Sequence, residues 1–369
     1  MKRITPVALL IAGSGTITPT YAEINPLEEV IVTSSRVEMP MRHVGTAVSV
    51  ITDEDITLRG FNSLYDVLRT SPGVSANNTG GAGGITSLQL RGEDGYRTLV
   101  LIDDIDVSDT SGPQVSPRME HLMSTGIQRV EILRGPQGLM YGADAGGVIS
   151  IHTTAAETGF HGNGQAEFGR YGTQQFSGGL GGGNGSVDYR VMASDFETDG
   201  FNARDTDNVL KDDDGYENTT VHGRGGWNIT ESLRAELVGH YIDGDNDYDD
   251  CFTGDTFEPT DRCSDDYEQN AWRAVVSHQG EHFSNQLAYS NNDIDRSLSA
   301  NGNQDYRFES ELEKVEYLGN WRQSDILSLV YGLEWKNESM DDGTFDTDRD
   351  QEGYFLEYQG NFTDNLYIT

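Results

Sequence analysis

The sequence is poor in basic side chains, in cysteine and in long hydrophobic runs. It has 25 Lys and Arg against 61 Asp and Glu, which gives a formal net charge of −36, and its mean hydropathy is −0.55. Nucleic-acid binding relies on Lys and Arg that neutralise phosphates, so this balance disfavours a nucleic-acid partner. No stretch approaches the roughly 20 consecutive apolar residues of a membrane helix. Cationic partners or bound divalent ions fit the composition better.

Cysteine and catalytic motifs are equally scarce. The two cysteines, Cys251 and Cys263, close a short loop rich in Asp. In an exported chain such a pair predicts a disulfide, whereas a metal site is disfavoured because no His stands nearby at ligand spacing. The eight histidines are scattered, and G-x-S-x-G, Walker and G-x-G-x-x-G motifs are absent. We therefore expect no enzyme activity and no required cofactor.

The first 22 residues have the pattern of an export signal. Lys2 and Arg3 precede a short apolar run, and small and polar residues lead to Ala22. This pattern predicts a secretory signal peptide over residues 1–22, cleaved near Ala22. The alternative is a short amphipathic helix, which Pro6 and a Gly-Ser-Gly run would disrupt.

A mixed region follows, from Pro40 to about Ala155. "TAVSVIT" predicts a strand, and Thr52 or Asp53 would then cap a helix that Pro72-Gly73 stops. "SLQLRGEDGYRTLVLIDDIDV" predicts two strands around residues 93–95. We expect residues 40–155 to form a small mixed α+β domain with its own core.

After Ala155 the pattern has a period of two residues. In residues 233–241, Leu233, Ala235, Leu237, Gly239 and Tyr241 share one face, and polar residues fill most of the other. Similar runs predict about ten antiparallel strands, joined alternately by short turns and by long acidic loops at 199–217, 243–266 and 339–351. This alternation is typical of a transmembrane β-barrel. A soluble β-sandwich or solenoid is the alternative, although the strands of most sandwiches average only about five or six residues.

The order of the motifs carries a family resemblance. The hexad "EEVIVT", then "LQLRGEDGYRTLVLIDDI", then "IQRVEILRGPQGLMYGADAGGVISI", then the strands, resembles the TonB-dependent outer-membrane receptors of the vitamin B12 and siderophore type. The resemblance covers residues from about 28 to the end. Two departures concern loop conformation: "YGADAGGVI" is one residue short, and Asp104 stands where members often have Gly.

The resemblance implies a plug inside a barrel. Residues 23–39 would be the TonB-box segment, residues 40–155 the plug, and residues 156–369 the N-terminal part of an incomplete 22-stranded barrel. Because barrels in lipid must close, about ten strands suggest a fragment or truncated product. The plug-motif residues are Arg91, Gly92, Asp103, Arg134, Gly135, Pro136, Tyr141, Gly142, Gly146 and Gly147. We expect the glycines to let backbones pass closely, and Arg134 to pair with barrel carboxylates.

The hexad resembles the box that TonB grips, comprising Glu28, Glu29, Val30, Ile31, Val32 and Thr33. Such a segment can add as a strand to a partner's sheet edge. The alternative is an ordinary N-terminal strand of the plug. The resemblance implies that TonB, energised at the inner membrane, pulls this segment and loosens the plug.

Ligand-binding candidates lie on two plug loops, residues 75–87 and 106–116. They are Asn77, Asn78, Thr79, Ser108, Asp109 and Gln114, unless these loops are merely solvated. The alternating carboxylates of one acidic loop suit a hard cation such as Ca²⁺, and the alternative is a simply solvated acidic loop. The candidate ligands are Asp243, Asp245, Asp247, Asp249 and Asp250.

Taken together, the resemblance implies TonB-dependent transport of a metal chelate, either a siderophore or cobalamin, by an exported outer-membrane protein in contact with lipid. The alternatives are a passive or structural barrel with a vestigial plug, such as a porin or adhesin, and a non-functional truncated receptor.

Overall fold

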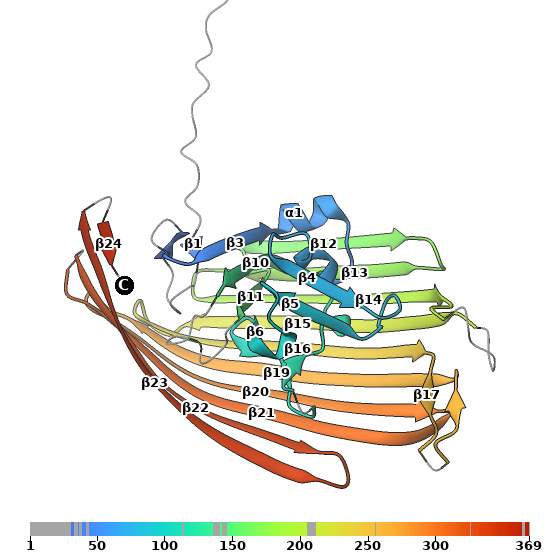
Figure 1. Ribbon diagram of the computed structural model, residues 1–369. Helices are drawn as coiled ribbons and strands as arrows, with labels where there is room; N and C mark the ends of the chain where they lie inside the picture. Colours follow the sequence, from blue (N-terminus) through green and yellow to red (C-terminus); the bar gives the residue numbers. More distant parts are fainter. Residues whose placement is uncertain are drawn as a thin grey trace, which may run out of the picture.

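The computed structural model describes residues 31–32, 36, 39–41, 44–112, 114–135, 141, 146–204, 212–254, 256–324, 326–363 and 366–368. They form a small mixed domain and a large curved antiparallel sheet (Figure 1). The predicted signal peptide and residues 28–30 and 33 of the hexad lie outside the described residues. In the part of the chain that is described, no helix is long and apolar enough to cross a membrane.

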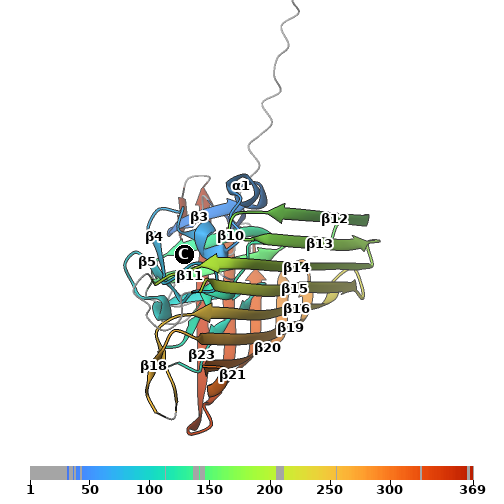
Figure 2. The same ribbon diagram turned by 90° about the vertical axis from the view of Figure 1, so that its right-hand side faces the viewer.

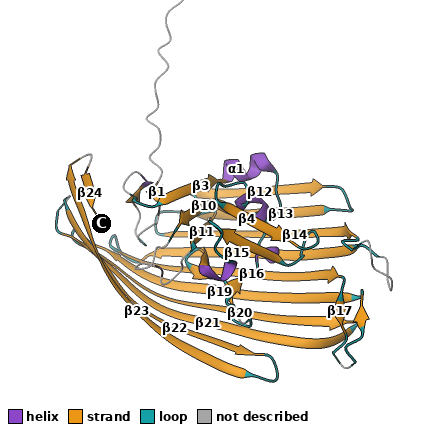
Figure 3. Ribbon diagram, viewed as in Figure 1, coloured by secondary structure: helices purple, strands orange, loops and turns teal. Residues whose placement is uncertain are grey.

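The small domain, called the plug below, is built on a five-stranded sheet of order β3-β10-β11-β6-β7. Its strands are β3 (Ala47–Thr52), β6 (Thr98–Ile102), β7 (Ile105–Asp106), β10 (Ile127–Arg134) and β11 (Gly147–Thr153). Two short hairpins add β4 (Val74–Asn78) with β5 (Thr86–Leu90), and β8 (Ser108–Asp109) with β9 (Ser116–Pro117). The predicted mixed α+β composition is therefore present (Figure 3).

The predicted helix is divided into two. α1 (Asp53–Arg59) begins at Thr52, whose side chain accepts from the Asp55 amide while the Asp55 carboxylate accepts from the Thr52 amide. Gly60, at φ 63°, ends it in the left-handed conformation that glycine adopts freely. α2 (Leu64–Leu68) follows and buries Leu64, Val67 and Leu68.

The large sheet contains eleven strands in the described residues, all antiparallel to their neighbours. Sequence neighbours pair throughout, except that the β17 (Cys251–Phe252) and β18 (Pro259–Thr260) hairpin is inserted between two of them. The strands are β12 (Gly159–Phe168), β13 (Gln174–Gly183), β14 (Val187–Phe201), β15 (Asp214–Asn228), β16 (Leu233–Tyr248), β19 (Cys263–Gln279), β20 (Phe283–Ala300), β21 (Asn303–Arg322), β22 (Leu327–Asp341), β23 (Asp346–Thr363) and β24 (Leu366–Ile368). The prediction of about ten strands is thus close.

The two faces of the sheet differ as the period-two pattern predicts. Leu237 on β16 is 56% exposed on the convex face, whereas Ile242 on the same strand is fully buried on the concave face. Tyr354 and Leu356 on β23 are exposed like Leu237. The predicted apolar face is therefore the outer one.

The strands are longer than predicted, because several acidic segments expected as loops are paired backbone. β15 begins at Asp214, β16 continues to Tyr248, β19 begins at Cys263 and β23 begins at Asp346. The expected loop limits at 199–217, 243–266 and 339–351 were therefore wrong. Pairing with a neighbouring strand outweighs the low strand propensity of Asp.

The plug lies against the concave face of the sheet (Figures 1 and 2). Its hydrophobic core contains Leu64, Val130, Ile132, Ile149 and Ile151, and it continues into Ile242, Tyr267 and Ile294 of the large sheet. The two parts therefore share one packed interface.

Candidate functional site

The plug motif forms a β10–β11 hairpin in which two glycines meet neighbouring backbone. A Cβ on Gly147 would overlap the Leu133 carbonyl oxygen, and one on Gly146 would lie 3.0 Å from the Arg97 carbonyl oxygen. Gly147 also has a φ of 132°, which side chains rarely adopt. The expected role of this glycine pair in close backbone passage is confirmed. Pro136 and Gly142 lie outside the described residues.

Arg134 does not reach the barrel wall, so the expected ion pair with barrel carboxylates was wrong. Its Nε donates to the Pro72 carbonyl at 2.8 Å, and its Nη1 donates to the Ser49 hydroxyl at 2.8 Å. Burial and the neighbouring Arg91 lower the pKa of Arg134. Arg134 is the last residue of β10, which lies between β3 and β11 in the plug sheet. Its two hydrogen bonds go to Pro72 and Ser49, so it connects parts of the plug to one another.

Arg91, Gly92 and Asp103 also serve plug turns. Arg91 and Gly92 have φ values of 56° and 82°, and the Arg91 amide donates to the Gly73 carbonyl at 2.7 Å. Asp103 accepts from the Thr153 amide at 3.0 Å and from its hydroxyl at 2.5 Å. These contacts join the turn after β6 to the end of β11.

An ion network, found by the structure and not by sequence reasoning, connects the N-terminal segment to the wall. Arg36 Nη1 lies 2.6 Å from Glu316 Oε2, and its Nη2 lies 2.9 Å from Glu334 Oε2. Lys314 pairs with both carboxylates, at 2.9 and 3.0 Å. Burial opposes the charge of Arg36, but Glu316 and Glu334 hold its pKa above the usual value.

The same network includes the plug. The guanidinium of Arg36 lies 5.0 Å from the centre of the Tyr141 ring, a cation–π distance. Arg273 on β19 lies 3.3 Å from Glu316 and 3.4 Å from Asp104 of the β6–β7 turn. Asp104 has a φ of 63°, a left-handed conformation that glycine adopts freely. The aspartate adds a carboxylate that pairs with Arg273.

The described part of the hexad is a short strand. β1 (Ile31–Val32) pairs antiparallel with β2 (Met39–Pro40). This hairpin is separate from the five-stranded plug sheet. Binding of this segment to TonB stays a prediction.

The first ligand loop connects β4 and β5, and Asn78 organises it. The Asn78 amide nitrogen donates to the Gly84 carbonyl at 2.8 Å, and its oxygen accepts from the Gly81 amide at 2.7 Å. Its side chain is therefore engaged within the loop. Asn77 and Thr79 are exposed, as a ligand contact requires.

The tip of this loop fits closely against the wall. A Cβ on Gly83 would overlap the side chains of both Asn246 and Tyr216. Ala82 packs against Met123, Phe196 and Tyr216. The tip of the loop is therefore held in place by side chains of the large sheet.

The second ligand loop is largely buried, contrary to expectation. Asp109 is 2% exposed and accepts from Arg118 Nε at 2.7 Å within the plug; burial raises its pKa, but Arg118 and Ser111 lower it overall. Ser108 is also buried, and its carbonyl accepts from Asn292 on β20. Asp109 therefore fixes the loop and Ser108 joins it to the wall, while Gln114 is exposed.

Glu120 and His121 were not identified from the sequence, and they lie where the plug contacts the large sheet. Glu120 is buried and accepts from the Thr86 amide at 3.1 Å, and burial raises its pKa to about 7. His121 stacks on Tyr267 with ring centres 4.2 Å apart, and its Nδ1 lies 3.2 Å from the Tyr216 hydroxyl. Burial and the charges of Arg296 and Arg118 lower the His121 pKa to about 3, so the ring is neutral. No spacing in the sequence indicates these contacts, because Thr86, Tyr216 and Tyr267 are distant in the chain.

The acidic segment does not gather its carboxylates. Asp243, Asp245 and Asp247 alternate along the exposed face of β16, and Asp249 and Asp250 follow in the turn. Asp250 pairs with Arg204 at 2.8 Å. Within the described ranges, no group of three or more His, Cys, Asp or Glu side chains is arranged to hold a metal. Calcium binding here stays a prediction.

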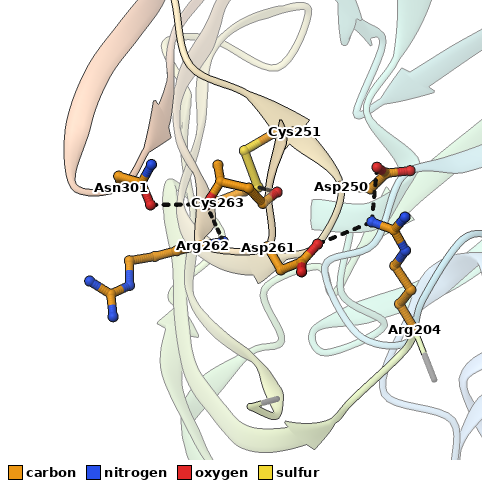
Figure 4. The surroundings of a disulfide bond; sticks show 8 residues. Arg204, Asp250, Cys251, Asp261, Arg262, Cys263 and Asn301 are labelled. Atoms are coloured by element: carbon orange, nitrogen blue, oxygen red, sulfur yellow. Dashed lines mark hydrogen bonds and ion pairs between the residues drawn. A yellow bond between two sulfur atoms is a disulfide. The ribbon is translucent and has the colours of Figure 1, made fainter. Parts of the chain in front are cut away.

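The disulfide between Cys251 and Cys263 is present, as predicted (Figure 4). Arg204 lies 2.8 Å from Asp250 and 3.1 Å from Asp261, so it ties the preceding loop to the disulfide loop. The Thr260 hydroxyl also donates to the Asn301 side-chain oxygen at 2.9 Å. The disulfide loop is therefore fixed at the same end of the sheet as the long connections.

The fold and the contacts between the plug and the large sheet define a class of protein. In this class a small domain packs against the polar, concave face of a β-barrel sheet. Residues 40–149 match the family model of the TonB-dependent receptor plug domain. Residues 40–149 therefore form a TonB-dependent receptor plug domain, and the chain is similar to the TonB-dependent receptors over the plug and part of the barrel.

Curated relatives and solved structures agree with this assignment. The chain is 30% identical over 324 residues to the vitamin B12 transporter BtuB of Photobacterium profundum, covering 84% of this chain and 50% of the relative. It is 27% identical over 346 residues to BtuB of Vibrio vulnificus, covering 91% and 54%. A variant of the ferric enterobactin receptor PfeA of Pseudomonas aeruginosa has the same fold, with a TM-score of 0.71, 20% identity and coverage of 86% and 55%. The chain thus spans about half the length of its curated relatives.

Proposed function

We propose that the protein takes part in TonB-dependent uptake of a metal chelate across the outer membrane, as an exported, non-enzymatic receptor. The observation that carries this proposal is the seating of the plug against the concave wall, joined by buried hydrogen bonds such as Asn292–Ser108 and Thr110–Ser310. The plug is held by these polar contacts and by the apolar contacts of its core with Ile242, Tyr267 and Ile294. The polar contacts can be exchanged for water while the barrel stays folded. The eleven strands would then belong to a larger barrel of 22 strands.

The N-terminal segment is the part that TonB would pull. Arg36 connects this segment both to the wall, through Glu316 and Glu334, and to the plug, through Tyr141. Tension on residues 28–33 would therefore act first on this network. Mechanical work on the chain requires no hydrolysis by it.

Cobalamin is the first ligand to test, and an iron-loaded siderophore the second. The curated relatives at 27% and 30% identity are named vitamin B12 transporters, whereas the likeness to the enterobactin receptor is one of fold. The exposed Asn77, Thr79 and Gln114 are the plug residues that would contact the ligand.

The test is uptake of radiolabelled cyanocobalamin, and separately of ferric enterobactin, by cells whose own receptors are deleted. With the complete receptor, whose barrel is closed, we expect accumulation of one ligand that stops when the proton gradient is collapsed. Deletion of residues 28–33 should reduce uptake to background and leave ligand binding to isolated membranes within about twofold.

A passive or structural barrel protein is the competing function. It predicts ligand entry that is indifferent both to the proton gradient and to deletion of residues 28–33. That result would refute the energised transporter. Absence of both binding and uptake would instead support a non-functional receptor.

A further inference from the structure

Two histidines form a buried pair on the lumen side of the wall. His222 on β15 and His240 on β16 are direct partners in the strand register. Their side chains are 8% and 5% exposed, and their Nδ1 atoms lie 2.8 Å apart. The rings stack with centres 4.5 Å apart and an angle of 27° between planes. Nothing in the plug–wall joints described above uses them.

The pair is not fully satisfied by hydrogen bonding. Within the described residues, the Nε2 atoms of His222 and His240 are both buried and have no hydrogen-bond partner. Buried polar atoms normally have a partner, so these two call for an explanation. No acceptor or donor at Nε2 fixes the tautomer of either ring. In the hydrogen bond between the two Nδ1 atoms, one ring carries its proton on Nδ1. If that proton moves to the unpartnered Nε2 of the same ring, both Nδ1 lone pairs become available to one cation.

The distance between the two Nδ1 atoms fits a chelate. A metal with bonds of about 2.0–2.1 Å to two imidazoles at right angles holds the nitrogens about 2.8–3.0 Å apart. Facing positions on adjacent strands bring Cβ atoms within about 5 Å, which lets both rings approach one ion. A metal ion can therefore bridge the two nitrogens with little movement of either side chain.

We propose that His222 and His240 form a bidentate site for a divalent transition metal such as Cu²⁺ or Ni²⁺, which accept ligands at right angles. Imidazole nitrogens favour these ions, whereas Ca²⁺ and Mg²⁺ require oxygen ligands. No third His, Cys, Asp or Glu side chain in the described ranges completes a set of ligands. Water or a chelator would have to fill the remaining coordination positions of the ion.

A cavity lies beside the pair, although neither histidine lines it. It has a volume of about 290 Å³ between plug and wall, and both Gly126 and Met192 line it. A Cβ on Gly126 would lie 3.2 Å from Met192 Cγ and 3.3 Å from His222 Cδ2. Met192 is also the register partner of His222 on β14. Gly126 and Met192 therefore lie both at this cavity and beside His222.

The decisive experiment is electron paramagnetic resonance of the receptor isolated from outer membranes and loaded with one equivalent of Cu²⁺. Excess Ca²⁺ is added so that the many surface carboxylates are occupied. We expect pulsed spectra showing two imidazole nitrogens coordinated to one copper ion. Coordination by oxygen alone, or by a single imidazole, would overturn the proposal, and this measurement needs no variant.

Variants then assign the signal. His222→Gln and His240→Gln should each weaken Cu²⁺ binding, measured by calorimetry, by at least about tenfold and remove the two-nitrogen signature. His282→Gln, on an exposed turn, is the control and should change neither. A two-imidazole signal that survives both substitutions in the pair would place the metal elsewhere and also refute the site.

Discussion

At the scale of single residues, the plug depends on a few residues that are so closely packed that a different side chain would not fit. Gly147 is one, because any Cβ would overlap the Leu133 carbonyl oxygen. Glu120 is another, because its carboxyl is buried at 4% exposure between plug and wall. Both positions are fixed by packing, and each leads to a test.

Gly147→Ala should abolish assembly of the plug, because the φ of 132° and the backbone clash both oppose it. We expect a loss of more than about 3 kcal/mol and little mature protein resistant to protease. Gly185→Ala is the matched control: its φ is 84°, yet nothing lies within 4 Å of the added Cβ. It should cost about 1 kcal/mol. Equal yields of the two variants would contradict the packing argument.

Glu120 should make the plug less stable as pH rises. Burial raises its pKa from 4.5 to about 7, so between these values the folded state binds more protons than the unfolded state, and stability falls with increasing pH. Glu120→Gln keeps an oxygen for the Thr86 amide and removes the charge. At pH 8 we expect slower hydrogen exchange of β5 amides in the variant, corresponding to a gain of up to about 3 kcal/mol.

The pH dependence is the control for this prediction. Near pH 5 the carboxyl is mostly protonated in the folded protein, so the variant and the original protein should exchange nearly alike. A difference of the same size at pH 5 and pH 8 would show that the charge of Glu120 is not its cause.

At the scale of elements, the β1–β2 hairpin pairs only with itself among the described residues, and the Arg36 side chain connects its segment to the large sheet. The hairpin has two residues per strand, whereas Arg36 makes two ion pairs, at 2.6 and 2.9 Å. Such buried pairs are costly to break singly, because the partner charge stays buried.

Arg36→Gln should therefore release the N-terminal segment without removing the plug. A spin label on Val32→Cys should give a more mobile spectrum in this variant than in the unmodified background. Arg59→Gln, on the exposed end of α1, serves as the control. An unchanged spectrum in Arg36→Gln would mean that other contacts hold the segment.

At the scale of the whole molecule, the outer face of the sheet is divided into an apolar band and an acidic band. One row of register partners contains Asp243, Glu268, Asp295, Glu309 and Asp341 on successive strands. A row nearer the other end of the strands contains Leu237, Ala274, Tyr289, Val315 and Trp335. The second row fits lipid, and the first lies beyond it.

Leu237→Arg should accordingly impair insertion far more than Asp243→Arg on the same face of the same strand. An arginine facing the middle of the bilayer costs about 2–4 kcal/mol, and one near the interface costs about 0–1 kcal/mol. The amount of folded protein in outer membranes measures this. Equal amounts would show that the apolar row does not face lipid.

The sequence by itself determined what depends on local pattern: the alternation that places Leu237 outward, the plug with its glycine pair, the disulfide and the family resemblance. Tertiary structure alone decided the partners of Arg134, the burial of Asp109 and the meeting of Arg36 with Glu316. These contacts join residues far apart in the chain, as do Glu120 with Thr86 and His222 with His240. Spacing in sequence carries the period of a strand but not the register and docking that bring distant side chains together.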